Sequence, residues 1–366
     1  MSALFQPITI GQLVLPNRIA IAPMCQYSAD DGSASDWHMF HWMNLAMSGA
    51  GMVTVEMTDV ERRGRISHGC HGLYTEHNMR AAKRALDAAR AVAAPGVKFG
   101  VQLAHAGRKA SCQRPWEGGG PLMAGQDPWE TVSASAIPFD KGYHTPRALN
   151  EGEILELIEK FAISAQRAER AGFDFIELHG AHGYLLHQFL SPLSNERGDR
   201  WGGSLENRMR FLVEVARAVR KAVPSLMLGA RLSVKDWVDG GFDEDECVTV
   251  VNTLRSEGVS YICCSSGGIS PLQQIPAGPG YQVHLAEFIR KNTGIAVRAV
   301  GMIDSPTQAE EIISSGRADM VAVARAVLAD SHWPLRTAAA LGVDFRLANQ
   351  YDRAAHLLKK WGREWN

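Results

Sequence analysis

Eight short apolar runs, separated by longer amphipathic stretches, restrict the fold of this chain more than any other feature. The runs span residues 18–24, 51–57, 97–103, 173–178, 226–232, 259–265, 295–301 and 318–324. Continuous rather than alternating apolarity is typical of parallel strands that are covered on both faces. Amphipathic helices are predicted between them, for example over 154–172 and 204–224. Strand and helix alternating eight times predict a single (β/α)8 TIM barrel.

The segments outside this repeat can be placed on the predicted barrel. Residues 5–18 are expected to form a hairpin over its bottom, and the Gly-, Pro- and Trp-rich stretch 107–149 an excursion at its top, after the third strand. A doubly wound sheet is the alternative, but it usually has a Gly-rich turn after the first strand. Pro23, Met24 and Cys25 occupy that turn here, and no dinucleotide-binding glycine motif or P-loop is present. We therefore expect one domain over residues 1–366.

Composition excludes several classes of protein. With 46% hydrophobic and 21% charged residues among 366, the chain can bury a large core. Its 38 basic and 39 acidic residues give a net charge of −1, which argues against a nucleic-acid-binding surface. We see no signal peptide and no apolar stretch of membrane-spanning length. The six cysteines have no regular spacing, so we expect a cytoplasmic protein without a disulfide framework.

Polar side chains recur where the predicted strands end, while the strand bodies stay apolar. Barrel enzymes place their chemistry at these carboxyl ends, so the eight segments are expected to build one site. Two of them follow strands seven and eight, where barrels commonly bind phosphate with main-chain N–H groups and a helix N-terminus. Gly301 and Arg325 occupy these positions, and a salt-bridged arginine at the barrel rim is the alternative. Arg231, inside the fifth strand, must meet an anion, which is either Glu177 or a bound cofactor.

The segment "HGAHGY" at 179–184 carries two histidines and a tyrosine directly after the fourth strand. The histidines could bind zinc, with His105 or His187 as a third ligand, but no carboxylate or thiolate stands at a familiar ligand spacing. They could also be buried for structural reasons alone. The third interpretation is a pair of N–H donors that hold a carbonyl or nitro oxygen while Tyr184 supplies a proton. We favour this last one and expect no metal.

Long motifs in the chain resemble those of the old yellow enzyme family. They are "IAPMCQYS" after the first strand, "VQLAHAGRKA" at the third, "ELHGAHGYLLHQFLSPLSNERGDRWGGSLENRMRF" at the fourth and "QYDR" near the end, so that the resemblance runs from about residue 5 to 353. Cys25 with Tyr27 is similar to the thermophilic-like or xenobiotic-reductase-like branch. The resemblance implies an NADPH dehydrogenase of the ene-reductase type, which uses bound FMN and NADPH or NADH to reduce α,β-unsaturated carbonyl or nitro compounds.

The resemblance also implies roles for individual residues. His179 and His182 would hold the substrate oxygen, Tyr184 would protonate the α-carbon, Tyr27 would add a hydrogen bond to the substrate, and Cys25 would tune the flavin. Gln102 and Arg231 would contact the pyrimidine part of the flavin, and Gly301 and Arg325 its phosphate. The complete set of predicted cofactor-binding residues is Pro23, Met24, Cys25, Met57, Gln102, Arg231, Ser266, Gly267, Gly301, Met302, Ala324 and Arg325.

The chain departs from the family pattern in three places. Met57 stands where the branch usually has alanine, and Ala324 stands where glycine is usual before Arg325. The third departure is the long tail, from about residue 345 to 366, which we expect at a subunit interface of a homodimer or homotetramer. In relatives an arginine at the position of Arg353 reaches the neighbouring site; whether Arg353 or an aromatic residue such as Trp361 does so here is open.

Two other functions remain as alternatives at this point. One is a non-catalytic, flavin-binding redox sensor, suggested by Cys25 and Met57. The other is a non-flavin, phosphate-binding barrel lyase in which Lys235, just past the fifth strand, forms a Schiff base.

Overall fold

Eight parallel strands close into a barrel in the computed structural model, which describes residues 2–364. The last strand pairs with the first through Val321 and Ile19, and the first with the second through Ala20 and Met52. The prediction of a (β/α)8 barrel is confirmed, with each strand inside or close to its predicted run. The barrel strands are β3 (Ile19–Ile21), β4 (Met52–Asp59), β6 (Lys98–Ala104), β9 (Phe175–Gly180), β10 (Met227–Ser233), β11 (Tyr261–Ser265), β12 (Ala296–Val300) and β13 (Met320–Val323).

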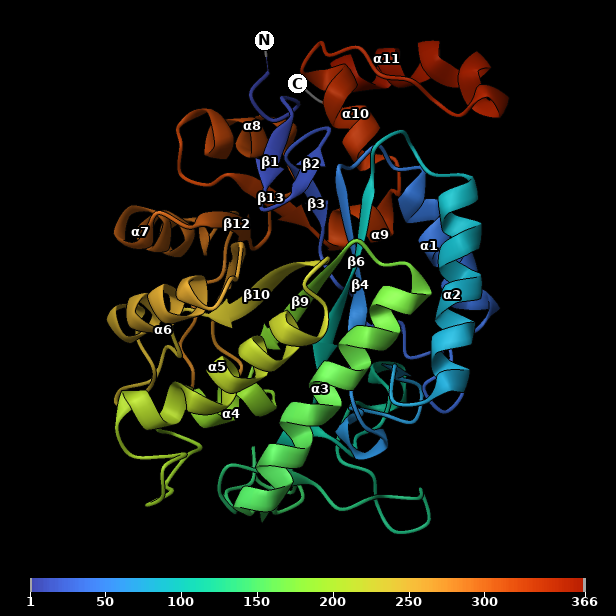
Figure 1. The fold of residues 1–366 in the computed structure, drawn as a ribbon. Helices are drawn as coiled ribbons and strands as arrows, with labels where there is room; N and C mark the ends of the chain where they lie inside the picture. The colour runs from blue at the N-terminus through green and yellow to red at the C-terminus, as the bar shows by residue number, and fades with distance from the viewer. Residues whose placement is uncertain (1, 365–366) are drawn as a thin grey trace.

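Helices surround the barrel and cover the outer faces of its strands (Figure 1). The two helices predicted at 154–172 and 204–224 are α3 and α5. Gly172 ends α3 in a left-handed conformation with φ of +100°, which favours a residue without Cβ, and Ser204 caps the start of α5. The helices are α1 (Asp36–Ala46), α2 (Glu76–Ala91), α3 (Glu151–Ala171), α4 (Leu185–Leu190), α5 (Leu205–Ala222), α6 (Glu244–Ser256), α7 (Val283–Thr293), α8 (Pro306–Ser314), α9 (Arg325–Ala329), α10 (Trp333–Ala340) and α11 (Ala355–Glu364).

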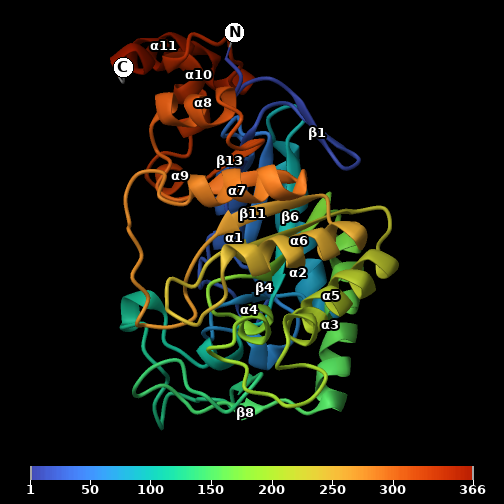
Figure 2. The same ribbon diagram turned by 90° about the vertical axis from the view of Figure 1, so that its left-hand side faces the viewer.

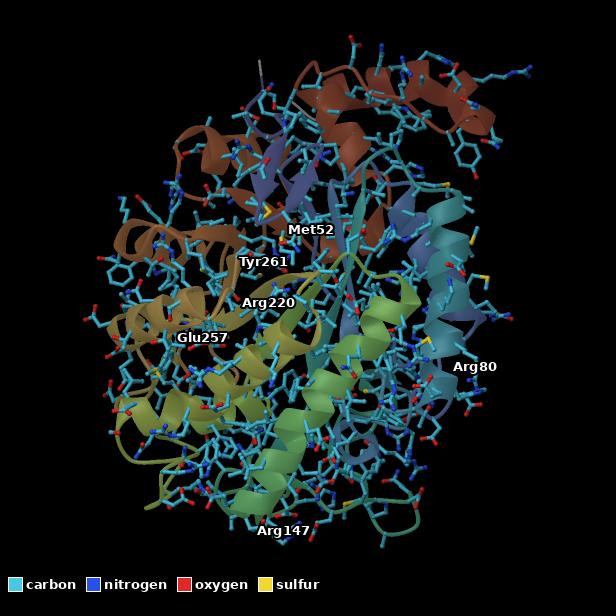
Figure 3. All side chains as sticks on the ribbon, viewed as in Figure 1. Met52, Arg80, Arg147, Arg220, Glu257 and Tyr261 are labelled. Atoms are coloured by element: carbon cyan, nitrogen blue, oxygen red, sulfur yellow. The ribbon has the colours of Figure 1, made fainter. Side chains whose placement is uncertain are left out.

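The predicted hairpin closes one end of the barrel. Strands β1 (Ile8–Ile10) and β2 (Leu13–Leu15) pair antiparallel, and Ile10 and Leu15 are buried in a cluster with side chains from inside the barrel. Met52 and Tyr261, which belong to this cluster, are labelled in Figure 3 and lie beside the hairpin. The cluster is apolar apart from one phenol, so it forms a hydrophobic seal at the amino-terminal ends of the strands.

A polar layer lies above this seal, inside the barrel. Inward-facing residues alternate along a strand, so Glu177 of β9 lies between Phe175 of the seal and His179 at the carboxyl end. Glu177 forms a fully buried ion pair with Arg298 and accepts a 2.8 Å hydrogen bond from the Tyr261 hydroxyl. The suggestion that Glu177 pairs with Arg231 is therefore wrong, because the barrel register brings Arg298 of β12 to this layer instead.

The excursion and the tail lie at opposite ends of the molecule (Figure 2). Residues 107–149 contain two 3₁₀ turns, η2 (Gly107–Lys109) and η3 (Pro115–Glu117), and the short pair β7 (Val132–Ser133) and β8 (Arg147–Ala148). The tail passes through η4 (Asn349–Ala354) into α11, which packs on α10 near the hairpin. The remaining short elements are η1 (Arg62–Gly64) and β5 (His71–Gly72).

Among residues 2–364 no helix combines the length and the apolar character that crossing a membrane requires.

Candidate active site

A cavity of about 410 Å³ opens at the carboxyl ends of the last barrel strands. Seven residues predicted from the sequence line it: His182, Arg231, Ser266, Gly301, Met302, Ala324 and Arg325. Several other lining residues, among them Tyr281 and Gln282, were not predicted, because the stretch before α7 has no strand or helix pattern.

Two arginines make this cavity cationic. The Arg231 Nε is buried and has no hydrogen-bond partner in the part of the chain that the structure describes. Arg325 begins α9 and is exposed, and no acidic residue within residues 2–364 forms an ion pair with it. A guanidinium group cannot lose its charge cheaply, so a buried and unpaired one indicates that an anion or an acceptor belongs beside it. The alternative of a salt-bridged rim arginine is not what the structure shows for Arg325.

The backbone at Gly301 approaches the opposite wall closely. Its φ is +125°, and a Cβ there would lie 2.8 Å from Nε2 of Gln282 and 3.0 Å from the Tyr281 ring. Gln282 accepts a 2.6 Å hydrogen bond from the Ser266 hydroxyl and donates a 2.9 Å bond to the Val300 carbonyl. Gln282 therefore fixes two segments of the cavity wall to each other, and only glycine fits at position 301.

His179, His182 and Tyr184 form a compact cluster at the edge of the cavity. The ring of His179 lies 5.1 Å from that of His182 and 4.9 Å from that of Tyr184, with both pairs nearly perpendicular. Nδ1 of His179 accepts a hydrogen bond from the Ala181 N–H, so its Nε2 carries the proton. Burial and the nearby Arg231 lower the pKa of both histidines well below the usual value. Both rings are therefore neutral at physiological pH. His179 can donate from Nε2, whereas Nε2 of His182 lies 2.7 Å from the Ser265 hydroxyl, so a ligand would meet His182 at Nδ1.

The backbone between these groups adopts a left-handed turn, with φ of +58° at His182 and +73° at Gly183. A Cβ on Gly183 would lie 2.1 Å from the Gly268 carbonyl oxygen, so glycine is required there. Side chains satisfy all four backbone polar groups of this turn. Ser233 Oγ accepts from His182 N at 3.0 Å, Lys109 Nζ donates to His182 O at 2.9 Å, His187 Nδ1 accepts from Gly183 N at 2.9 Å, and Gln188 Nε2 donates to Gly183 O at 2.7 Å.

The two histidines proposed as a third zinc ligand have other partners. Nε2 of His187 lies 2.9 Å from Asp236, and Nε2 of His105 lies 2.9 Å from Glu61, all four side chains being largely buried. Because Nδ1 of His187 accepts from a backbone N–H, its Nε2 must carry the proton and donate to Asp236. Within residues 2–364 no three His, Cys, Asp or Glu side chains come together as metal ligands would.

An apolar cluster beside Tyr184 forms the floor of the site. Cys25, which follows the first barrel strand β3, packs on this cluster. Met57 is buried against Ala104, and Cys25 and Tyr184 pack on the same cluster. Met57 is thus part of the buried cluster on which Cys25 and Tyr184 pack. Burial raises the pKa of the Cys25 thiol well above its usual value, with Cys70 and Glu56 nearby adding to it. The thiol is therefore protonated rather than a reactive thiolate.

The remaining predicted residues lie outside the cavity wall. Pro23 and Met24 lie between β3 and Cys25, and the Gly267 carbonyl accepts a 2.8 Å hydrogen bond from the Ser233 hydroxyl. Gln102 belongs to the polar layer, where its Nε2 donates to Glu177 at 2.9 Å. Within residues 2–364 this is the hydrogen bond found for the Gln102 side chain.

Two residues proposed for other roles are also placed by the structure. Lys235 forms a 3.0 Å ion pair with Glu244 and does not line the cavity, which removes it from a Schiff-base position. Arg353 is exposed in η4, on the tail that packs near the hairpin, and is not part of the wall of the cavity in its own chain.

Comparisons with known proteins agree with this geometry. A family model for the NADH:flavin oxidoreductase / NADH oxidase family matches residues 3–342. An NADPH dehydrogenase from Geobacillus sp. (strain WCH70) is 41% identical over 352 residues, covering 96% of this chain and 98% of that protein. Morphinone reductase is 27% identical with a TM-score of 0.78, covering 94% of this chain and 91% of that one. A 2-naphthoyl-CoA reductase complex is 26% identical with a TM-score of 0.83. The match covers 100% of this chain and 58% of that one.

The barrel, its cationic cavity and these relatives define a flavin-dependent oxidoreductase. The chain belongs to the NADH:flavin oxidoreductase / NADH oxidase family, and the resemblance to the old yellow enzymes is confirmed. Its cofactor is FMN and its hydride donor is NAD(P)H. The cavity fits such a group, because two arginines that form no ion pair within residues 2–364, Arg231 and Arg325, line it together with the backbone at Gly301.

Proposed function

We propose that the protein reduces the C=C bond of α,β-unsaturated carbonyl or nitro compounds. Bound FMN would supply the redox chemistry, taking hydride from NAD(P)H at N5 and passing it to the β-carbon of the substrate. Arg231, with Gln102, would hold the pyrimidine part of the flavin, while Arg325 and the backbone at Gly301 and Ser266 would hold its phosphate. The protein's own side chains then bind the acceptor and move one proton.

The single observation that carries this proposal is the perpendicular cluster of His179, His182 and Tyr184. Two neutral imidazoles can donate N–H bonds to one substrate oxygen and stabilise the negative charge that develops there. Tyr184, whose pKa burial raises well above its usual value, keeps its proton until the α-carbon needs it. Tyr27 would add a hydrogen bond to the acceptor.

Anaerobic reoxidation tests the proposal. The FMN-loaded protein, reduced with NADPH or NADH under nitrogen, should be reoxidised by 2-cyclohexenone in a stopped-flow experiment. Tyr184→Phe should slow this step by about 10²- to 10⁴-fold, because a positioned acid contributes that much. The rate of reduction by NADPH is the internal control and should stay the same. If none of a panel of enones and nitroalkenes reoxidises the flavin, ene reduction is disproved and the redox sensor is favoured.

Binding of a phenol tests the histidine pair separately. Phenolate mimics the developing oxyanion, so His179→Ala should weaken phenol binding to the oxidised protein by about tenfold or more. Undiminished binding would remove His179 from this role.

The tail suggests how the protein assembles, and we propose that it forms a homodimer or homotetramer. Arg353 is exposed on the tail, so it can only contribute to a site that belongs to another copy. Light scattering of the full chain and of Arg353→Ala, together with the enone reoxidation rate, would test whether Arg353 completes a neighbouring site.

A further inference from the structure

The backbone at Tyr27 is held in an unfavourable conformation by the excursion. Its φ of +51° lies in the left-handed region, which non-glycine residues rarely adopt. Arg114 donates a 3.1 Å hydrogen bond from Nε to the Tyr27 carbonyl. Gly69 packs against the same carbonyl so closely that a Cβ would lie 2.1 Å from its oxygen. Such strain persists only where the surroundings enforce it, and it clusters at functional sites.

The same arginine anchors a short turn over the Tyr27 ring. The Glu117 carboxylate accepts hydrogen bonds from the Arg114 guanidinium at 3.0 Å and from its backbone N–H at 3.1 Å, which closes η3. The turn places the ring of Trp116 6.0 Å from that of Tyr27, at an interplanar angle of 82°. Trp116 is nonetheless 66% exposed, so the contact with Tyr27 leaves most of the indole available.

Tyr184 lies next to both the histidine pair and an apolar cluster. Its ring is 4.9 Å from that of His179, and together with Cys25 it packs on the buried cluster of Met57 and Ala104. Tyr27 is near enough to contribute to the raised pKa of Tyr184. Tyr184 thus neighbours the histidine pair and Tyr27, which makes the ring contact with Trp116.

We propose that η3 is a specificity-determining wall of the substrate site, in which Trp116 contacts the ligand and Arg114 positions Tyr27, and that the site selects planar, ring-bearing acceptors over small acyclic ones. This rests on the proposed function, because it takes the histidine pair as the place where the oxygen binds. An indole that stays two-thirds exposed beside a tyrosine leaves aromatic surface for a second ring, and aromatic contacts are worth about a several-fold gain in affinity beyond the area buried. Acyclic acceptors have no ring to place there.

The test measures binding to the oxidised, FMN-loaded protein, so it does not depend on turnover. Phenol serves as the ring-bearing probe and acetate as the acyclic oxygen ligand, each titrated by calorimetry. Trp116→Ala should raise the Kd of phenol about five- to tenfold and leave that of acetate within about twofold, with Trp116→Phe in between. Arg114→Ala should show the same selective loss. The matched control is Met123→Ala, which removes another exposed apolar side chain of the excursion and should change neither Kd.

Three results would overturn the proposal: phenol binding that Trp116→Ala does not change, an equal loss for phenol and acetate, or no phenol binding to the unaltered protein. Because no hydride donor is present, these results are independent of the enone reoxidation that tests ene reduction. If the enone fails to reoxidise the flavin while Trp116→Ala still weakens phenol binding selectively, the role of η3 is supported and ene reduction is disproved.

Discussion

At the level of single side chains, the two arginines of the cavity differ in how they are held. Arg231 projects from β10 with a buried Nε, whereas Arg325 sits exposed at the start of α9. A buried guanidinium without a protein partner gains most when a ligand supplies the acceptor. We therefore expect flavin binding to depend strongly on Arg231.

Replacing Arg231 should weaken FMN binding. We expect Arg231→Ala to raise the Kd of FMN by about 10- to 100-fold, the range for a lost hydrogen bond to a charged group. Quenching of FMN fluorescence by the apoprotein measures this directly. Arg80→Ala, which removes a surface arginine of α2 (Figure 3), is the control and should leave the Kd unchanged. A change of less than twofold for Arg231→Ala would contradict the assignment.

Lys109 makes stability depend on pH in the alkaline range. Burial, with Arg108 nearby, lowers the pKa of Lys109 to about 8, while the unfolded chain keeps the ordinary value of 10.5. Between these values the unfolded state binds the extra proton, so the free energy of unfolding should rise as pH increases from 8 to 10.5. The rise should reach at most about 3 kcal/mol. Urea unfolding across this range should show it, and Lys109→Met should remove it; a parallel pH dependence in both proteins would refute the explanation.

At the level of elements, the turn after β9 is shaped by four side chains from three other segments, β10, η2 and α4. The left-handed residues of this turn cannot form the hydrogen bonds of a helix or a strand. Their backbone groups bond instead to the side chains of Ser233, Lys109, His187 and Gln188. Ser233 also donates to the Gly267 carbonyl, which ties the turn to the segment after β11.

Removing one of these bonds should affect ligand binding as well as stability. Ser233→Ala leaves the His182 N–H unpaired, so we expect a loss of about 1–2 kcal/mol in the free energy of unfolding and several-fold weaker phenol binding. Thermal unfolding and calorimetric titration measure the two effects. Ser314→Ala, at an exposed position at the end of α8, is the matched control. Lower stability with unchanged phenol affinity would mean that Ser233 supports the fold without positioning His182.

The strand ends could be predicted from the sequence, but much of the cavity wall could not. Parallel strands covered on both faces leave continuous apolar runs, so the positions of His179, Arg231 and Gly301 followed from local pattern alone. Gln282 lies after an irregular stretch and carries no such pattern. The partner of Glu177 also escaped prediction, because contacts across a barrel depend on the register of every intervening strand pair. The Arg114–Tyr27 contact joins an excursion to the first strand and has no local signal.

At the level of the whole molecule, the barrel interior has an apolar seal, a polar layer and a binding site, one above another. The middle layer contains the buried pair of Glu177 and Arg298, to which Gln102 and Tyr261 are bonded. A buried ion pair is costly to break and less costly to replace as a whole.

Breaking this pair should destabilise the protein strongly. Glu177→Gln leaves Arg298 as an uncompensated buried charge, so we expect a loss of about 3–5 kcal/mol in the free energy of unfolding. The double replacement Glu177→Met with Arg298→Met should recover most of it. Lys83→Met, which breaks an exposed pair with Asp87, should cost about 0.5 kcal/mol or less in the same urea experiment. A double variant no more stable than Glu177→Gln would show that the layer contributes more than charge balance.

The amino-terminal hairpin has a kinetic consequence. Since Ile10 and Leu15 close one end of the barrel, the nicotinamide and the molecule to be reduced must both approach from the other end. We predict that they bind there in turn, so that the oxidised donor departs before the second reactant binds, which is a ping-pong order. Double-reciprocal plots of initial rate at several NADPH concentrations should accordingly give parallel lines, and intersecting lines would mean that both reactants fit at once.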